Sequence, residues 1–278
     1  MSRHGVTFNK GYGQNFLINE AVPRRIAEEC GASPDDGILE IGPGIGTLTV
    51  ELARRYKKVV SVEIDDRLIP VLNETLAEFE NTEVINADFM KTDAKKLIAD
   101  KFGGMNVTVC ANLPYYITSP ILMKLLESEL ELDNITVMVQ KEVALRLCSK
   151  PGESDYSALT ASVMRYGKVE KLFGVSAGSF MPAPKVDSAV IKISLFKEKN
   201  YSVKDEKLLD RVIRGAFAQR RKNLTNTLST EFPEIPKSEM SVLLTGLGFG
   251  GGTRGEMLGI GEYAAIADAI YEIKENCK

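Results

Sequence analysis

The tetrapeptide Asn112-Leu113-Pro114-Tyr115 follows an apolar run and carries the groups needed to activate an amino nitrogen. An exocyclic amine of a nucleobase is a poor nucleophile because its lone pair is delocalised into the ring. An amide oxygen and an adjacent backbone carbonyl that accept its two N–H groups can localise that pair and direct it at an electrophile. Asn112 offers the amide and Leu113 the carbonyl, while Pro114 restricts the turn. The ring of Tyr115 offers a face on which a planar base can stack.

A glycine turn upstream, Gly42-Pro43-Gly44-Ile45-Gly46, lies between a predicted strand and a predicted helix. Such a turn lets the backbone approach a nucleotide-like ligand closely, and an acid that ends the next strand can accept hydrogen bonds from ribose hydroxyls. Glu63 lies 21 residues after Gly42, as that role requires. The G-x-G-x-G spacing differs from the dinucleotide fingerprint, and the turn has no basic residue for a pyrophosphate. S-adenosylmethionine therefore fits this turn better than NAD.

Asp88 follows the third predicted strand and is expected to accept a hydrogen bond from the adenine amino group of the cofactor. Taken singly, Glu63 and Asp88 could be ordinary acids at strand ends, and the tetrapeptide could be an ordinary proline turn. Together with the glycine turn, they favour transfer of a methyl group to an amino nitrogen.

Composition restricts the class of protein. The chain has 278 residues, 44% of them hydrophobic, which suits one large domain and one smaller one. No apolar stretch reaches the roughly 18 residues of a membrane span, and the N-terminus lacks the apolar centre of a signal peptide, so we expect a cytoplasmic protein without a membrane partner. The sequence has one histidine, His4, near its N-terminus, so we expect a mechanism that does not use an imidazole group. The four cysteines are scattered, which favours reduced thiols and no metal site.

Strand-like and helix-like segments alternate through the first two-thirds of the chain. The predicted strands are 37–41, 58–63, 83–86, 107–111 and 135–139, and the predicted helices are 47–56, 66–79, 91–102, 119–130 and 141–148. This alternation predicts an α/β fold with a Rossmann-like, doubly wound parallel sheet. Ligands of such sheets bind beyond the carboxyl ends of the strands, where the glycine turn, Glu63, Asp88 and Asn112 all fall.

The pattern changes after residue 150. Residues 169–175 and 187–196 are expected to pair as an antiparallel hairpin at the edge of the sheet. From residue 204 onward only helices are predicted, at 205–218, 222–230, 237–247 and 262–275. We therefore expect a catalytic, cofactor-binding domain at residues 1–198 and a small all-helical domain at residues 199–278.

The distribution of charge indicates a local RNA contact. A net charge of −3 and a pI near 5.5 argue against a uniformly basic nucleic-acid binder. Residues 211–226 nevertheless hold five basic residues and no acid: Arg211, Arg214, Arg220, Arg221 and Lys222. Such a cluster is often only a solvated face, and it could instead pack the helical tail against the catalytic domain. We expect Arg214, Arg220, Arg221 and Lys222 to bind RNA phosphates, with Arg3 and Lys10 of the N-terminal arm as the alternative contact.

The motifs, in their order along the chain, resemble those of the small-subunit ribosomal RNA adenine N6-dimethyltransferases of the KsgA type. Each motif is weak alone, but the ordered set covers nearly the whole chain. The matching segments are 13–17 (Gly-Gln-Asn-Phe-Leu), 40–49, 62–65 (Val-Glu-Ile-Asp), 112–115, 140–146, 180–188 (with Pro-Ala-Pro-Lys-Val-Asp-Ser) and 217–222 (with Gln-Arg-Arg-Lys).

The resemblance implies dimethylation of two adjacent adenosines in a loop near the 3′ end of small-subunit rRNA, with S-adenosylmethionine as donor and the small ribosomal subunit or its rRNA as partner. It also implies a contribution to subunit assembly, and we expect a monomer. Asn112 and the Leu113 carbonyl would orient the target amine, and Tyr115 with Phe180 would sandwich the base. The residues expected to contact the cofactor are Asn15, Leu17, Gly42, Gly44, Glu63, Asp88 and Asn112.

Three other functions share part of this pattern. A macrolide-resistance methyltransferase would act on large-subunit rRNA, whereas residues 182–188 and 217–222 favour the small subunit. A DNA adenine methyltransferase would need a DNA-reading domain, for which the helical tail is too short. A non-catalytic assembly factor would have lost turnover, which the intact set of Gly42, Glu63, Asp88 and Asn112 disfavours. The chain departs from the family pattern at Tyr116, where many relatives carry Asn, and in its acidic pI.

Overall fold

The computed structural model describes residues 14–276. The expectations that concern Arg3, His4 and Lys10 lie outside the described residues. Contacts between residues divide the chain into two compact units. The first contains the described residues up to Ala144 together with Lys168–Leu195, and the second contains Leu145–Gly167 together with the residues from Phe196 onward. The second unit includes the segment Leu145–Gly167, which we expected to belong to the catalytic domain.

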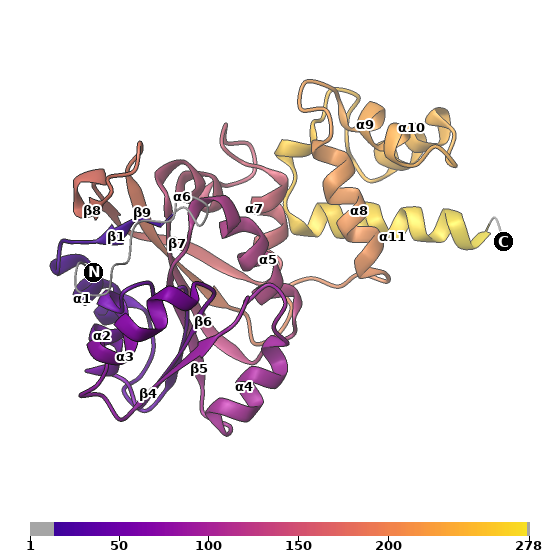
Figure 1. Ribbon diagram of the computed structural model, residues 1–278. Coiled ribbons are helices and arrows are strands. Elements are labelled where there is room, and N and C mark those ends of the chain that lie inside the picture. The colour runs from indigo at the N-terminus through magenta and orange to yellow at the C-terminus, as the bar shows by residue number, and fades with distance from the viewer. Residues whose placement is uncertain (1–13, 277–278) are drawn as a thin grey trace. The chain divides into compact units, whose positions relative to one another are not determined.

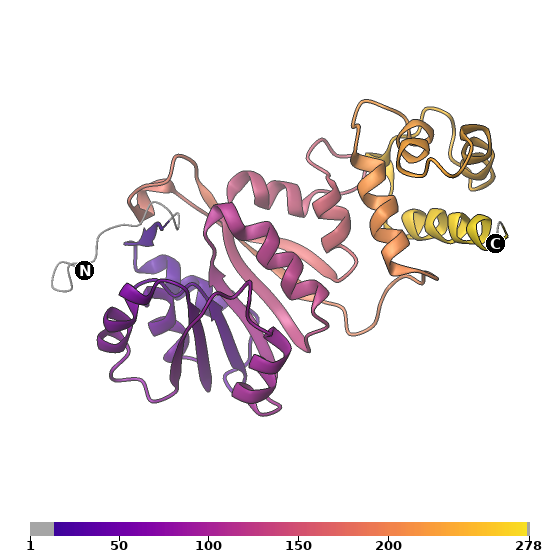
Figure 2. The same cartoon turned by 45° about the vertical axis from the view of Figure 1, so that its right-hand side comes forward.

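The first unit is built on a seven-stranded sheet in the order β4-β3-β2-β5-β6-β9-β7 (Figures 1 and 2). The bounds of its strands are β2 Gly37–Ile41, β3 Lys58–Glu63, β4 Thr82–Asn86, β5 Val107–Asn112, β6 Leu132–Gln140, β7 Gly167–Val175 and β9 Ser188–Leu195. Strands β2 to β6 pair in parallel, and β9 pairs antiparallel with β6. Strand β2 is buried along its whole length, as expected for a parallel strand covered on both faces. The predicted doubly wound sheet is confirmed, and β9 and β7 are neighbours at its edge.

The helices of this unit follow the strands in alternation. Their bounds are α1 Ala21–Glu29, α2 Thr47–Ala53, α3 Ile69–Thr75, α4 Ala94–Phe102 and α5 Thr118–Glu127, with short 3-10 turns at Asp66–Leu68, Tyr115–Ile117 and Ala177–Ser179. Helix α6, Lys141–Cys148, begins in this unit and ends in the second. Right-handed crossovers place α2 and α3 on one face of the sheet and α4 and α5 on the other, as in Figure 1. Helix α4 is preceded by Asp93, whose side chain accepts a hydrogen bond from the Lys96 amide as an N-cap. It is followed by Gly103, which has the left-handed conformation of a C-cap.

A separate two-stranded sheet joins the N-terminal part of the described chain to a distant segment. Strand β1 (Phe16–Leu17) pairs antiparallel with β8 (Phe180–Met181), so that Leu17 lies opposite Phe180. Both Leu17 and Phe180 are buried in a hydrophobic cluster that also includes residues of α1 and α2. Neither strand was expected from the sequence, because two residues carry no recognisable periodicity.

The second unit is all-helical. Its helices are α7 Ala158–Val163, α8 Glu206–Phe217, α9 Leu224–Glu231, α10 Lys237–Gly246 and α11 Ile260–Asn276, with a 3-10 turn at Gly255–Met257. Helix α8 carries a buried apolar stripe with Leu209, Val212 and Ile213, and it packs side by side with α11 (Figures 1 and 2). None of the helices in residues 14–276 is both long and apolar enough to cross a membrane.

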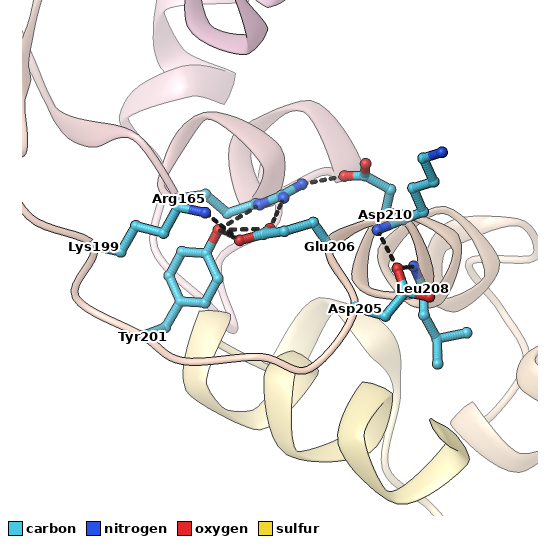
Figure 3. A network of polar contacts seen from close by, with 8 residues as sticks. Arg165, Lys199, Tyr201, Asp205, Glu206, Leu208 and Asp210 are labelled. Carbon is cyan, nitrogen blue, oxygen red and sulfur yellow. Dashed lines mark hydrogen bonds and ion pairs between the residues drawn. The ribbon is translucent and has the colours of Figure 1, made fainter. Parts of the chain in front are cut away.

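A buried arginine ties the segment Leu145–Gly167 to α8 within the second unit. The Arg165 guanidinium is almost fully buried and donates to Glu206 Oε2 at 2.5 Å, to Asp210, and to the Tyr201 hydroxyl at 3.2 Å (Figure 3). Lys199 forms a further ion pair with Glu206. A buried charge with this many partners contributes to stability only while its partners remain. This network explains why the segment groups with helices that are distant in sequence.

Candidate active site

The predicted site residues meet at the point where the direction of the sheet winding reverses. From β2 the chain proceeds to β3 on one side, whereas β5 lies on the other side. Ligands of doubly wound sheets bind at such a switch point, beyond the carboxyl ends of the strands. A pocket of about 820 Å³, including its open mouth, lies there.

Most of the predicted site residues line this pocket. The expected residues in its wall are Asn15, Leu17, Gly42, Gly44, Glu63, Asn112, Leu113, Pro114 and Tyr115. They come from β1, from the turn after β2, from the end of β3 and from the turn after β5. Tertiary folding therefore brings the glycine turn and the tetrapeptide into one cavity.

The glycine turn has a backbone that only glycine adopts readily. Gly42 and Gly44 have φ angles of 70° and 61°, in the left-handed region. A Cβ atom on Gly42 would meet no atom within 4 Å, so this glycine borders open space. A Cβ on Gly44 would lie 3.1 Å from the Phe16 ring. The turn is therefore open on the side of Gly42 and closed by β1 on the side of Gly44.

Glu63 is held by backbone amides at the end of β3. Its Oε2 accepts from the Gly44 N–H at 3.0 Å, and its Oε1 accepts from the Asp65 N–H at 2.8 Å. Burial raises the pKa of Glu63, and the two amide donors act in the opposite direction. The bond to Gly44 joins the acid to the glycine turn, so the two predicted parts of the cofactor site are directly connected.

The turn after β5 leaves two acceptors unused. The Pro114 carbonyl accepts from the Ile117 N–H at 3.1 Å and from Thr118 Oγ1 at 3.2 Å, which fixes the turn. Within residues 14–276, neither the Asn112 side-chain amide nor the Leu113 carbonyl has a hydrogen-bond partner. These are the two groups that the sequence assigns to a target amine.

The hydroxyl of Tyr115 is bound by a residue of another strand, β9. Its hydroxyl lies 2.6 Å from Ser188 Oγ, at the start of β9, and burial raises the pKa of the phenol. The ring is therefore attached at both ends, through its backbone turn and through its hydroxyl. A fixed ring can offer a face to a planar ligand with little loss of conformational entropy.

Two of the predicted residues do not line this pocket. Asp88 accepts from the Met90 N–H at 2.9 Å, and Lys91 approaches it at 3.6 Å. Phe180 is only 3% exposed and belongs to the cluster around Leu17. Their expected roles with the cofactor and the base therefore remain predictions.

The pocket lining also includes residues that received no role from the sequence, among them Glu40, Ile64 and Tyr116. Ile64 is 45% exposed and follows Glu63, so it offers an apolar surface beside the acid. A signal for Glu40 was present, because a charged residue inside an apolar strand requires a partner or a function. Ile64 and Tyr116 carried no such signal, since exposure is decided by tertiary structure.

Glu40 is a buried acid in the lining of the pocket. Its Oε2 accepts from Thr49 Oγ1 at 2.7 Å and from Ser61 Oγ at 2.8 Å. Burial raises the pKa of Glu40 from 4.5 to about 7, against the effect of these two donors and with a smaller contribution from the Glu63 charge. The carboxyl group therefore changes its protonation near neutral pH.

The Glu40 pKa predicts how stability depends on pH. Since the pKa is higher in the folded than in the unfolded state, this contribution to stability is complete below about pH 4.5 and is lost as the pH rises to about 7. Glu40→Gln imitates the protonated carboxyl and keeps an oxygen for Thr49 and Ser61. We expect the variant to be more stable than wild type by up to roughly 3 kcal/mol at about pH 8, and by little near pH 4.5.

Denaturant unfolding of both proteins across this pH range measures the difference. Ser61→Ala, which keeps the carboxyl but removes one donor, should retain the pH dependence. A stability difference between wild type and Glu40→Gln that does not change with pH would contradict the assignment.

The predicted RNA-binding residues all lie in the second unit, but one of them is engaged. Arg220 pairs with Glu256 at 2.9 Å and donates to the Ser154 carbonyl. The side chains of Arg214, Arg221 and Lys222 are exposed, and in the described part of the chain they have no hydrogen-bond or ion-pair partner. Arg211 is paired with Glu231 and Glu234. The cluster therefore offers three available cations and two that stabilise the helical unit.

No group of three or more His, Cys, Asp or Glu side chains that could hold a metal ion occurs in residues 14–276. The described cysteines are not in disulfides.

Comparisons with known proteins extend over nearly the whole chain. A family model described as ribosomal RNA adenine dimethylase matches residues 5–246. "Ribosomal RNA small subunit methyltransferase A" of Geobacillus thermodenitrificans is 44% identical over 273 residues, which are 97% of this chain and 93% of that protein. The protein of the same name from Alkaliphilus metalliredigens is 43% identical over 270 residues, with coverages of 97% and 94%.

Solved structures agree with these relatives. A dimethyladenosine transferase from Plasmodium falciparum superposes with a TM-score of 0.74 at 27% identity and covers 94% of this chain and 98% of its own. The 23S rRNA methyltransferase ErmE superposes with a TM-score of 0.71 at 29% identity, covering 92% and 100%. Because the family model matches most of the chain and the relatives are this similar over nearly their full length, the chain belongs to the ribosomal RNA adenine dimethylase family.

Proposed function

We propose that this protein dimethylates the N6 amino groups of two adjacent adenosines in a loop near the 3′ end of small-subunit rRNA, with S-adenosylmethionine as methyl donor. One observation carries the proposal. The unused acceptors of Asn112 and Leu113 line the same pocket as the glycine turn and Glu63. A methyl donor and an amino acceptor can therefore be held in a single cavity.

The pocket suits S-adenosylmethionine on chemical grounds. Gly42 leaves open space for a close approach of the ligand, and the buried Glu63 carboxylate can accept hydrogen bonds from two ribose hydroxyls. Asn15 and Leu17 close the cavity from β1. When bound, S-adenosylmethionine supplies an electrophilic methyl group on a cationic sulfur. We assign Asp88 to the adenine amino group, although its present partners are Met90 and Lys91.

The chain itself orients the nucleophile. The Asn112 amide oxygen and the Leu113 carbonyl accept the two N–H groups of the target amine and thereby direct its lone pair. Their dipoles also stabilise the positive charge that develops on the nitrogen during transfer. Tyr115 stacks on the base, with Phe180 as the proposed second face. No strong base is needed before attack, because the amine becomes acidic only after it has gained the methyl group. A neutral thioether would be the leaving group, and the methylated nitrogen would then release its extra proton to water.

The target adenosine must leave its stack to enter the pocket. This step costs a few kcal/mol for a stacked base and least for a base that is already single-stranded. Loops and helix ends of RNA are therefore the favoured targets. Stacking on an aromatic ring returns roughly 1–3 kcal/mol per base.

The small subunit is the favoured substrate because the relatives named ribosomal RNA small subunit methyltransferase A share 43–44% identity with this chain over nearly its full length. We further propose that the protein acts in the cytoplasm as a monomer and contributes to subunit assembly. Residues 1–198 would then form the catalytic domain and residues 199–278 the RNA-recognition domain.

Primer extension tests the proposal, since dimethyladenosine blocks reverse transcriptase. The rRNA of a strain that lacks the gene should lose the stop at the adenosine pair near the 3′ end of the small-subunit rRNA, and the purified protein with S-adenosylmethionine should restore it. Restoration of a stop in large-subunit rRNA would favour the alternative substrate. Binding without any methyl transfer would favour a non-catalytic assembly factor.

The available cations of the helical unit predict the salt dependence of binding. If Arg214, Arg221 and Lys222 neutralise RNA phosphates, each lost contact should reduce the slope of log affinity against log salt by ~0.7–0.9. We expect the triple alanine variant to bind small subunits more weakly, with a shallower slope and unchanged affinity for S-adenosylmethionine. Binding measured from low to moderate salt gives the slope.

Arg220→Ala is the matched control for this prediction. It removes the same charge, but its guanidinium is already paired with Glu256. We expect it to lower the melting temperature of the helical unit and to change the salt slope less than Arg221→Ala does. An unchanged slope in a folded triple variant would remove the cluster from the RNA interface.

A further inference from the structure

Tyr116 has a large exposed ring at the pocket, although no role follows from its sequence position. It is 61% exposed, whereas its neighbour Leu113 is almost fully buried. It lines the same pocket as Asn112 and Tyr115. Exposed aromatic side chains cost hydration free energy, so one that borders a ligand site is a candidate contact.

The ring of Tyr116 has no partner in the described part of the chain. No hydrogen bond, ring contact or cation–π contact involves its side chain within residues 14–276. The adjacent Tyr115 differs, because its hydroxyl is bound to Ser188. The two tyrosines therefore have different tasks. Tyr115 is fixed in the pocket wall by its hydroxyl, whereas Tyr116 is an exposed part of the same wall.

Local hydrogen bonds close the turn of the backbone that carries Tyr116. The Pro114 carbonyl accepts from both Ile117 and Thr118, and these two bonds enclose the tyrosine pair in a 3-10 turn that leads into α5. A ring on a fixed turn loses only its own side-chain freedom on binding, which favours affinity. The backbone position of Tyr116 is thus set before any ligand arrives.

We propose that Tyr116 stacks against the nucleotide next to the target adenosine and so positions the RNA strand at the mouth of the pocket. This inference rests on the proposed function. When one adenosine occupies the pocket, its flanking base must remain outside, close to the turn that holds Asn112 and Tyr115. A planar base there can cover the exposed ring of Tyr116. Tyr116 is a positioning residue in this role, since it does not contact the reacting amine.

The test compares Tyr116→Phe, which keeps the ring, with Tyr116→Leu, which keeps an apolar side chain without a π-face. The probe is an RNA hairpin in which 2-aminopurine replaces the base beside a single target adenosine. Stacking on an aromatic ring quenches 2-aminopurine fluorescence. We expect quenching by wild type and Tyr116→Phe, and its loss in Tyr116→Leu, with RNA affinity reduced roughly tenfold.

Kinetics separate positioning from a structural effect. Tyr116→Leu should raise the KM for RNA while leaving the KM for S-adenosylmethionine and kcat at saturating RNA nearly unchanged. Phe196→Leu is the matched control, because Phe196 is also an exposed aromatic residue but does not line the pocket. It should leave all three values at the level of wild type.

The outcomes distinguish this inference from the proposed function. If wild type methylates small subunits and Tyr116→Leu quenches the probe and binds RNA as wild type does, the role of Tyr116 is wrong and the proposed function stands. If Tyr116→Leu instead weakens S-adenosylmethionine binding, Tyr116 contacts the cofactor and the inference is overturned. If wild type itself transfers no methyl group, the proposed function fails first.

Discussion

Asn112→Ala should reduce methyl transfer to small subunits by roughly 10²–10³-fold, the size of effect seen when one positioned polar group is removed from an active site. The variant keeps the Leu113 carbonyl but loses the amide that directs the lone pair of the target nitrogen. Its fold should persist, because the Asn112 amide has no hydrogen-bond partner in the described chain. RNA affinity should change little. Transfer of a labelled methyl group to undermethylated subunits measures the loss.

Asn112→Asp provides the matched comparison. It keeps an acceptor oxygen at the same place and exchanges the amide nitrogen for a second, charged oxygen. We expect part of the activity to survive in this variant and to exceed that of Asn112→Ala. Near-normal turnover in the alanine variant would remove Asn112 from the mechanism, whereas unfolding of either variant, detected by thermal melting, would show a structural role instead.

Glu63→Ala should weaken S-adenosylmethionine binding at least tenfold, because hydrogen bonds to a charged acceptor contribute roughly 1.5–3 kcal/mol. The side chain also accepts from the Gly44 and Asp65 amides. Part of the loss will therefore come from a looser glycine turn. Titration calorimetry with S-adenosylmethionine gives the affinity, and the folded fraction is checked by a melting curve.

Asp66→Ala controls for charge in this experiment. Asp66 is an exposed acid three residues further on that does not line the pocket. Its removal changes the net charge equally and should leave cofactor affinity unchanged. Equal affinities of wild type and Glu63→Ala would contradict the assigned role of the strand-end acid.

The raised pKa of Glu63 should make the binding of S-adenosylmethionine depend on pH. The Glu63 carboxylate must be ionised to accept two hydroxyl donors, and burial raises its pKa above the ordinary value. Cofactor affinity should therefore fall as the pH decreases. The fall should begin at a higher pH than it would if the acid were an exposed glutamate.

The order of helices and strands could be predicted from the sequence because the local spacing of apolar residues indicates each type of element. Strand β2 was predicted with its observed bounds, and so was β3, since each is a short apolar run between turns. Helix ends were less accurate. The predicted helix 66–79 is a 3-10 turn followed by the shorter α3, Ile69–Thr75. Beyond α3, Ala77 and Phe79 donate backbone hydrogen bonds to Glu74 and Leu76, which is the spacing of a tight turn rather than of an α-helix.

Nine of the residues that line the pocket could be named in advance for a similar reason, and their roles remain predictions. Glycines with positive φ, an acid at a strand end and the Asn-Leu-Pro-Tyr turn each leave a signature in the sequence, because few other residue types can adopt those backbones or provide those groups. That signature also carried the family assignment, which the comparisons confirmed.

Tertiary structure decided what no local pattern contains. Segment Leu145–Gly167 groups with the C-terminal helices because Arg165 finds its carboxylate partners on α8, about forty residues away in sequence. Arg220 looks like its neighbour Arg221, yet only Arg220 is paired with Glu256. Tyr116 is exposed beside a fixed Tyr115, and Glu40 is buried beside two hydroxyls. Exposure, pairing and pKa depend on which distant groups surround a side chain, and that neighbourhood exists only in the folded chain.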